Sequence, residues 1–535
     1  MKRSLTSALA LLLLAGATFA GGIVTNTNQS AMYTRMVARQ ATLGIDAVYY
    51  NPAGLTKLEN GIHLSINNQT IGQTRTITSD YSYLNNGTFK GEVFAAAFPG
   101  VYGVFKMGKL AISAGFNPIG GGGGAEYATG LPSFEYSPAD LVPALQSQGQ
   151  NVTAYRMNAF LEGSSIFFGY QANVSYAIND MISVAIGGRF VTAKDKYTGY
   201  LKDIDILLDD NWTPATDFFA GAAAQYTTAA TNANNGSLLV QGDVAGGAAL
   251  TDPLTNVGAQ TILAALGVPA AAIALMDNQT AIGTLNGIYD GAITSAGEST
   301  VTSALLADQD VETEKTASGF TPIVSLNIQP IDMLNIAIKY EHLTKLEFTN
   351  KTAAGKGGTV GFDASTGQYI TLFPDGAKTN LDMPALLSVG ATLNPLDALL
   401  IATGFTYYFD KNANWGGREE LLDANSWDLA IGAEYALGDK LLASASWSMT
   451  ETGAMDTYQT DLSYSLSTTG ISFGIGYNIL SNLQLNLGAQ LVNYKDGQRN
   501  FQHDLANSGA MIPVLETYGK TVWVVGAGLN YSLSR

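Results

Sequence analysis

Residues 483–491 read Leu-Gln-Leu-Asn-Leu-Gly-Ala-Gln-Leu, an apolar side chain alternating with a polar or small one. Successive side chains of a β-strand point to opposite faces of the sheet, so this stretch predicts a strand with one apolar face. The same alternation recurs at 168–176, 427–435 and 523–533. The repetition indicates an all-β protein.

The composition of the two faces decides between a soluble sheet and a membrane barrel. The apolar faces carry aromatic residues near their ends, among them Trp427, Tyr435, Trp523 and Tyr531. Aromatic girdles of this kind mark the interfaces of membrane barrels. The opposite faces are rich in Gly, Ser, Asn and Gln, whereas a soluble β-sandwich usually places Lys, Glu and Thr toward water. The pattern therefore predicts a transmembrane antiparallel β-barrel.

Short turns and long inserts alternate along the chain. Asn, Asp, Pro and Gly suit tight reversals, and they predict turns at 176–180, 328–332, 393–397, 435–439 and 477–482. Short periplasmic turns and long external loops are typical of outer-membrane barrels. We predict about 14 strands, an even number as bacterial barrels require. Their ranges are 61–78, 91–106, 109–118, 160–178, 180–200, 317–329, 333–349, 381–394, 397–410, 426–437, 439–451, 461–478, 481–496 and 519–534.

The first 20 residues and the charge composition indicate the compartment. Lys2 and Arg3 precede an apolar run that ends at Ala20, which predicts a secretory signal peptide over 1–20 and export to the bacterial outer membrane. The chain has no cysteine, which excludes a lipoprotein, a disulfide scaffold and a thiolate metal site. Its net charge of −17 disfavours nucleic acid as a partner, because phosphates require a basic surface.

The largest insert, 201–316, has a different pattern. Its segments 217–231, 256–276 and 279–293 are rich in Ala and Leu, with apolar spacings closer to a helix than to a strand. We expect short amphipathic helices that cap the extracellular mouth, an ordinary packed loop being the alternative. The candidates for an exposed apolar groove there are Phe218, Phe219, Leu263, Leu266, Ile273, Met276 and Ile282.

The region 21–60 lacks strand alternation and carries a family resemblance. It contains Ser30, the pair Arg35 and Arg39, Asp46, and then Asn51-Pro52-Ala53-Gly54-Leu55. This order resembles the start of the FadL/TodX family of outer-membrane transporters of hydrophobic compounds, and the resemblance covers most of the chain. It implies a 14-stranded barrel (61–535) with an N-terminal hatch (21–60) in the lumen. It also implies passive uptake of long-chain fatty acids or other hydrophobic small molecules.

The resemblance further implies a kink in the third strand that opens a lateral exit through the wall. The third predicted strand ends in Phe116-Asn117-Pro118, and Gly120 begins a glycine run. Proline removes a donor from the hydrogen-bond ladder and glycine weakens strand pairing, so the wall is expected to bend here. A plain loop start is the alternative. A nucleotide-binding loop is excluded because no Gly-Lys-Ser/Thr follows.

A fatty acid needs a positive partner for its carboxylate. Strand parity places Arg189 and Lys339 on the polar face, and Lys194 near the external end of the fifth strand. These three are the carboxylate candidates. For each, the alternative is a charge that is paired with a nearby Asp or Glu.

Other functions remain weaker predictions. The histidines His63, His342 and His503 are isolated, and no metal-ligand cluster exists, so we expect no enzyme, cofactor or metal. A general diffusion porin and a structural or adhesive barrel are the alternatives to a transporter. Expected partners are a hydrophobic small molecule, outer-membrane lipids and lipopolysaccharide, and the periplasmic chaperones and barrel-assembly machinery. The chain is expected to be a monomer.

Overall fold

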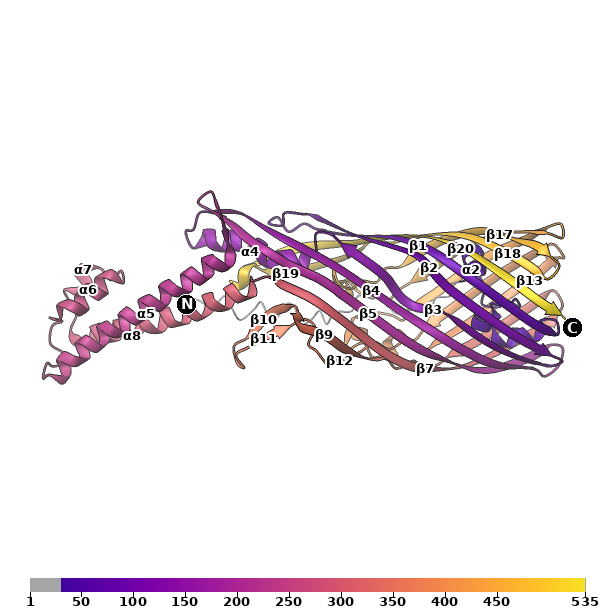
Figure 1. The fold of residues 1–535 in the computed structure, drawn as a ribbon, viewed down its shortest axis with the longest axis horizontal. Helices are drawn as coiled ribbons and strands as arrows, with labels where there is room; N and C mark the ends of the chain where they lie inside the picture. The colour runs from indigo at the N-terminus through magenta and orange to yellow at the C-terminus, as the bar shows by residue number, and fades with distance from the viewer. Residues whose placement is uncertain (1–29, 535) are drawn as a thin grey trace.

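Fourteen antiparallel strands close into a barrel in the computed structural model, which describes residues 30–534 (Figure 1). The predicted signal peptide, 1–20, and the start of the predicted hatch, 21–29, lie outside the described residues. The barrel closes because β1 pairs with both β2 and β20, from Gly61 opposite Ser534 to Ser79 opposite Glu516. The wall strands are β1 (Gly61–Ser79), β2 (Thr88–Met107), β3 (Leu110–Tyr127), β4 (Val152–Ala177), β5 (Ile182–Leu208), β7 (Gln309–Ile331), β8 (Leu334–Glu341), β13 (Leu386–Leu396), β14 (Leu399–Tyr408), β15 (Trp427–Leu437), β16 (Leu441–Glu451), β17 (Thr468–Leu480), β18 (Leu483–Tyr494) and β20 (Met511–Ser534).

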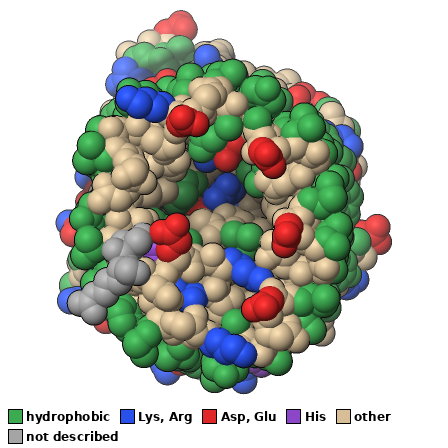
Figure 2. Space-filling model, turned by 90° about the vertical axis from the view of Figure 1, so that its right-hand side faces the viewer, with side chains coloured by type: hydrophobic (Ala, Val, Ile, Leu, Met, Phe, Trp, Pro, Cys, Tyr) green, Lys and Arg blue, Asp and Glu red, His purple; other side chains and the backbone are tan. Residues whose placement is uncertain are grey.

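The outside of the barrel is apolar and the inside is polar. In β18, Leu487 and Leu491 are exposed, whereas Asn486 and Gln490, each directly before one of them, are buried in the lumen. Figure 2 shows hydrophobic side chains around the outer rim of one barrel end and a hollow in its centre. In a soluble protein the apolar side chains face inward and the polar ones face water. The reverse arrangement seen here is stable only where lipid covers the outer face. Within residues 30–534, no helix is long and apolar enough to cross a membrane.

The five predicted short turns are confirmed. They join β4 to β5, β7 to β8, β13 to β14, β15 to β16 and β17 to β18, and the long connections leave the opposite end of the barrel (Figure 1). The predicted strand positions are confirmed as well, but several ends are wrong. β3 continues to Tyr127, β4 begins at Val152 and β5 continues to Leu208, because cross-strand pairing extends beyond the stretches that alternate.

Shorter elements extend the wall at the end with the long connections, called here the loop end. β6 (Asn211–Pro214), β9 (Glu347–Gly357), β12 (Lys378–Asn380) and β19 (Gly497–Asp504) add to the main sheet, and β10 (Thr359–Asp363) pairs with β11 (Gln368–Thr371). Four short 3-10 helices lie in the connections at this end: η2 (Asp410–Asn412), η3 (Arg418–Leu421), η4 (Asp456–Tyr458) and η5 (Leu505–Asn507). One helix that was not predicted, α4 (Pro132–Ser147), lies in the connection between β3 and β4.

The large insert is helical, as predicted, but it does not cap the mouth. Its long helices α5 (Ala215–Ala245) and α8 (Asn278–Leu305) form an antiparallel stalk that projects away from the barrel, with α6 (Val257–Ala265) and α7 (Ala270–Ile273) at its tip (Figure 1). The 31 residues of α5 correspond to a length of about 46 Å. The stalk can stand away from the barrel because α5 and α8 bury their small side chains against each other, including Ala233 and Ala281.

Candidate functional site in the barrel lumen

Residues 30–58, called here the inner segment, lie inside the barrel. They form α2 (Ala31–Arg35), α3 (Ala47–Tyr50) and η1 (Pro52–Lys57). Glycines on the inner face of the wall give this segment room, since a Cβ at Gly488 would collide with the backbone of Arg35 and one at Gly404 with Gln40. The segment therefore fits the wall closely along its length.

The motif predicted to mark the hatch contacts the wall directly. Asn51 Nδ2 donates to Asn327 Oδ1 at 2.7 Å, and the Ala53 amide donates to Ser325 Oγ at 2.9 Å. The Pro52 and Ala53 carbonyl oxygens accept from Ser175 and Ser183. A Cβ on Gly54 would collide with the Asn51 side chain, so glycine is required there. The motif thus binds polar side chains of β4, β5 and β7.

Two of the three predicted carboxylate partners, Arg189 and Lys339, are already paired with one carboxylate in a buried network. Arg189 binds Glu341 through two hydrogen bonds, of 2.6 and 2.9 Å, and Lys339 Nζ lies 2.7 Å from the same carboxylate. Lys339 also donates to the Tyr49 carbonyl of the inner segment at 2.9 Å. Both cations are almost fully buried. These residues hold the inner segment and offer no free charge to a ligand.

The third candidate, Lys194, does not face the lumen. It lies on the outer face of β5 and pairs with Glu314 at 2.7 Å, with about half of its side chain exposed. The two predicted hatch arginines are also paired, Arg35 with Glu434 of the wall and Arg39 with Asp46 of the inner segment, each at 2.7 Å. Each of these charges thus has an acidic partner.

A different pair of cations lines the lumen near the loop end. Arg75 of β1 stands directly opposite Lys520 of β20 in the strand register. Parity places both inside, since Arg75 is in phase with buried Gln73 and Ile77. Lys520 Nζ lies 4.6 Å from the centre of the Tyr494 ring. No ion pair between Lys520 and a carboxylate occurs within the described part of the chain.

The surroundings of this cation pair are apolar and aromatic. The buried side chains that pack together at this level, called here the upper chamber, are Ile77, Phe89, Val93, Ala125, Tyr127, Leu131, Leu161, Tyr464, Leu466 and Tyr518. An apolar lining with a few polar anchors is the general design of a small-molecule site. Sequence parity could have found Arg75 and Lys520, because both follow the polar phase of their strands, but their pairing depends on closure of the barrel.

The loop connecting β16 to β17 supports this chamber from the loop end. The backbone amide of Ser133, in the first turn of α4, donates to Asp461 Oδ2 at 2.8 Å. Burial of the carboxylate raises the pKa of Asp461 above its usual value. This contact holds α4 against the chamber, where Leu131 and Phe134 pack.

The wall is interrupted between β2 and β3. The two strands pair from Met107–Leu110 up to Val101–Phe116 and again at Gly91–Tyr127. Between these points, within the described residues, 93–100 of β2 and 117–125 of β3 do not pair with each other. The predicted bend residues Phe116, Asn117, Pro118 and Gly120 lie at the start of this interruption.

The path of β3 explains the interruption. Its register against β4 shifts at Pro118 and again after Gly120, so the strand bends. Ile119 is buried and packs into the lumen cluster with Phe167. Gly121 has a φ of +92° and passes so close to the Ser165 backbone that a side chain would collide. This conformation requires glycine.

The seven groove candidates are not brought together. Leu263 and Ile273 are buried at the stalk tip, and Leu266, Met276 and Ile282 pack around them. Phe218 and Phe219 lie at the base of the stalk, against a cluster that contains Leu306. The sequence pattern predicts a binding surface, but these side chains pack in two separate helical contacts.

The histidines show no catalytic arrangement. His63 contacts Ser532 Oγ at 2.9 Å, but its other ring nitrogen faces the backbone carbonyl of Glu59 rather than a carboxylate. His503 contacts Asp140 at 2.9 Å near the loop end. Within residues 30–534, no group of three or more His, Asp and Glu side chains could hold a metal ion.

Comparison with known proteins rests on structure alone, since neither a family model nor a curated protein matches the sequence. The crystal structure of a Pseudomonas aeruginosa FadL homologue matches with a TM-score of 0.56 and 14% sequence identity, over 96% of this chain and 99% of that one. A mutant of TodX, a monoaromatic hydrocarbon channel, matches with a TM-score of 0.50 and 12% identity, over 94% and 98%. The chain therefore has the fold of the FadL and TodX outer-membrane barrels.

Proposed function

We propose that this barrel carries long-chain fatty acids, or other hydrophobic small molecules with an acidic head, passively across the outer membrane. Two structures that share its fold are described as a FadL homologue and a monoaromatic hydrocarbon channel. The inner segment occupies the lumen, which argues against a general porin, whose lumen is open. The solute would move down its gradient.

The observation that carries the proposal is the cation pair Arg75 and Lys520. Like charges directly opposite each other on neighbouring strands destabilise a sheet. The pair is set among the tyrosines and aliphatic residues of the upper chamber, where water screens charge less than at the surface. An acid-headed amphiphile would place its carboxylate beside the two cations and its tail against the apolar side chains, whereas a neutral hydrocarbon would do only the second.

A route from the upper chamber into the membrane is part of the proposal. Gly91 of β2 lies beside Arg75 and opposite Tyr127 of β3, just above the interrupted stretch of the wall. Phe94, within that stretch, is exposed on the outside next to Trp523, with ring centroids 6.4 Å apart. A solute released from the chamber would thus reach the wall interruption near an aromatic girdle. Displacement of the inner segment would control access.

Uptake measurements with the double variant Arg75→Gln/Lys520→Gln test the proposal. Oleate uptake is expected to fall about tenfold or more, because each lost charge–carboxylate hydrogen bond contributes about 1.5–3 kcal/mol. Toluene uptake is expected to stay unchanged, since it has no charge. Lys411→Gln, which changes a charge in the loop between β14 and β15, is the matched control.

Three results would count against the proposal. Unchanged oleate uptake in the double variant would remove the role of the cation pair. Permeation of a small sugar without oleate uptake would favour a porin. Uptake of toluene but not oleate by the unmodified protein would leave a hydrocarbon channel as the function.

A further inference from the structure

The helix α4 lies at the loop end of the upper chamber. Leu131 and Phe134, at its start, pack with the side chains of the chamber. Farther along α4, Leu141 and Leu145 pack in a second apolar cluster at the same end. Figure 1 shows α4 close to this end of the barrel, whereas the stalk projects away from it. Together with the loop between β16 and β17, α4 therefore covers the chamber on its loop-end side.

One side chain of α4 marks its position above the cation pair. The Tyr136 hydroxyl donates to Glu516 at 2.6 Å and contacts Ser79 Oγ at 3.0 Å. Ser79 and Glu516 stand opposite each other across the β1–β20 seam, four residues along each strand from Arg75 and Lys520. The equal parity of the two pairs places both on the lumen side. Four residues of strand rise about 13 Å, so Tyr136 lies between the cations and the loop end.

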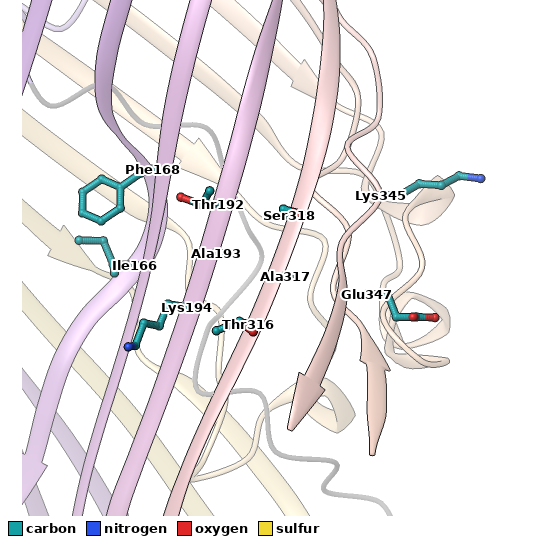
Figure 3. Close-up of a pocket in the computed structure, with 10 residues that line it drawn as sticks. All are labelled: Ile166, Phe168, Thr192, Ala193, Lys194, Thr316, Ala317, Ser318, Lys345 and Glu347. Atoms are coloured by element: carbon teal, nitrogen blue, oxygen red, sulfur yellow. The ribbon is translucent and has the colours of Figure 1, made fainter. Parts of the chain in front are cut away.

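A hollow of about 770 Å³ in the wall, between β4, β5, β7 and the start of β9, is not an entrance to the chamber (Figure 3). It shares no lining residue with the upper chamber. The strands beneath it are paired without a break, Phe167 with Ala193 and Ala193 with Ala317. Entry to the chamber from the loop end therefore depends on the cover.

Glycines in the left-handed conformation flank α4. Gly130 precedes the helix with a φ of +72°, and Gly149 follows it with a φ of +82°. A Cβ on Gly149 would meet open space, whereas one on Gly130 would collide with Ala159. Glycine reaches other backbone conformations at little cost, so the chain can change direction at both ends of the helix. This arrangement allows α4 to move as a unit.

Asp140 attaches the middle of α4 to its surroundings. Its carboxylate accepts hydrogen bonds from the Tyr81 hydroxyl at 2.5 Å and from the Ala506 amide at 2.9 Å. Both of its oxygens also lie 2.9 Å from His503 Nε2. These partners belong to the loop after β1, to η5 and to β19. They satisfy the buried carboxylate only while α4 stays in this position.

Glu135 is less well satisfied. Its Oε1 accepts from the Tyr155 hydroxyl at 2.6 Å and from the Asn85 amide at 2.9 Å. Its buried Oε2 has no hydrogen-bond partner among the described residues. A buried carboxylate oxygen without a donor is unfavourable relative to its hydrated state. Movement of α4 into water would hydrate this oxygen, which offsets part of the cost of exposing Leu131 and Phe134.

We infer that α4 is a hinged lid that closes the upper chamber at the loop end. In the closed position, Tyr136, Glu135 and Asp140 hold it against the wall. In the open position the two carboxylates are hydrated, and the chamber with Arg75 and Lys520 is accessible from the loop end. Opening of the lid does not depend on which solute the barrel carries.

Labelling of a single cysteine in the chamber tests the lid without reference to cargo. The chain has no cysteine, so Ile77→Cys, at a fully buried position of the chamber, is a unique reporter. The measurement is its rate of reaction with a small sulfonated maleimide, with the full chain in lipid nanodiscs. Adding Tyr136→Phe/Asp140→Ala is expected to raise this rate about tenfold or more, because the lost hydrogen bonds increase the open fraction. Tyr226→Phe/Asp290→Ala makes the same two changes at exposed positions of the stalk and is expected to leave the rate unchanged.

A disulfide provides the opposite test, in which the lid is locked. The Ser133 amide donates to Asp461 at 2.8 Å, so Ser133→Cys/Asp461→Cys places two thiols at adjacent positions of the lid and its support. Oleate uptake is expected to fall severalfold in the oxidised form and to recover when the disulfide is reduced. The reduced form of the same variant is the control.

Two results would overturn the lid. One is an unchanged labelling rate in the Tyr136→Phe/Asp140→Ala variant when heat-modifiable mobility shows an intact barrel. The other is equal oleate uptake by the oxidised and reduced forms of the locked variant. Absence of oleate uptake even in the unmodified protein would contradict the proposed function instead, and the labelling rate would then decide on the lid alone.

Discussion

Cations in the lumen are of two kinds, which differ in their neighbours. Arg189 and Lys339 share Glu341, and all three are shielded from solvent. Arg75 and Lys520 instead face each other across the β1–β20 seam. The first set is explained by packing of the inner segment. The second set places like charges opposite each other, which destabilises the sheet, and a ligand carboxylate could offset that destabilisation.

We predict that Glu341→Gln destabilises the barrel more than a surface substitution of the same type. Removing this carboxylate leaves Arg189 and Lys339 as buried charges without compensation, a loss on the order of 3–5 kcal/mol. The measurement is the midpoint of thermal unfolding in detergent, followed by the mobility shift of heated samples. Glu312→Gln, whose partner Lys356 is exposed, is expected to leave the midpoint unchanged. Equal midpoints for the two variants would contradict the prediction.

Gly488→Ala should displace the inner segment. The added Cβ would collide with the backbone of Arg35, which cannot move aside as a flexible side chain could. We expect a higher single-channel conductance in planar bilayers, because the lumen would be less completely filled. Gly103→Ala is the control, since its new Cβ would meet only Leu64, at 3.6 Å. Matching conductance in both variants would show that the inner segment does not limit ion flow.

At the scale of elements, β3 departs from the regular wall strand. Its bend combines Pro118, the two register shifts and the left-handed Gly121. Pairing between β2 and β3 resumes only at Glu92 and Glu126, so the interruption lies within the wall rather than at its end. The glycine run predicted a weak point, and its position between two paired stretches came from the structure.

Rebuilding β3 tests the role of this interruption. Replacing 118–124 with alternating Val and Thr should restore pairing with β2 and reduce oleate uptake severalfold, because the proposed lateral route would close. Pro513→Thr, a proline replacement where β20 pairs with β19, controls for general effects of changing a strand. Assembly is checked by heat-modifiable mobility. Full uptake by a correctly assembled variant would refute a lateral exit at this position.

At the scale of the whole molecule, the barrel and the stalk are nearly independent. The stalk has its own core at the tip, and Ser303 Oγ donates to the Thr216 carbonyl at 2.9 Å, so its two ends are adjacent. The stretch 203–314 contains no Lys, Arg or His.

Deleting 217–302 and joining the ends with a short Gly-Ser linker should leave a folded barrel. Because the two ends of the stalk are adjacent, a short linker can join them, and the free energy of closing a loop depends only weakly on its length. We expect unchanged heat-modifiable mobility and oleate uptake within about twofold of the full chain. A much lower uptake by the folded variant would show that the stalk takes part in solute capture.

The alternation of side chains was enough to predict the barrel, its strand number, its short turns and the apolar outer face, because period-two patterning records which side of each strand meets lipid. Pro118 and the glycine run after it indicated the weak point in the wall. Alternation could not predict the charge partners: Arg189 and Lys339 have the parity of ligand partners, yet both are paired with Glu341. Arg75 and Lys520 are separated by most of the chain and meet only when the last strand pairs with the first. Parity is a local property of the chain, whereas ion pairing, the wall interruption and the path of the stalk depend on contacts between distant segments.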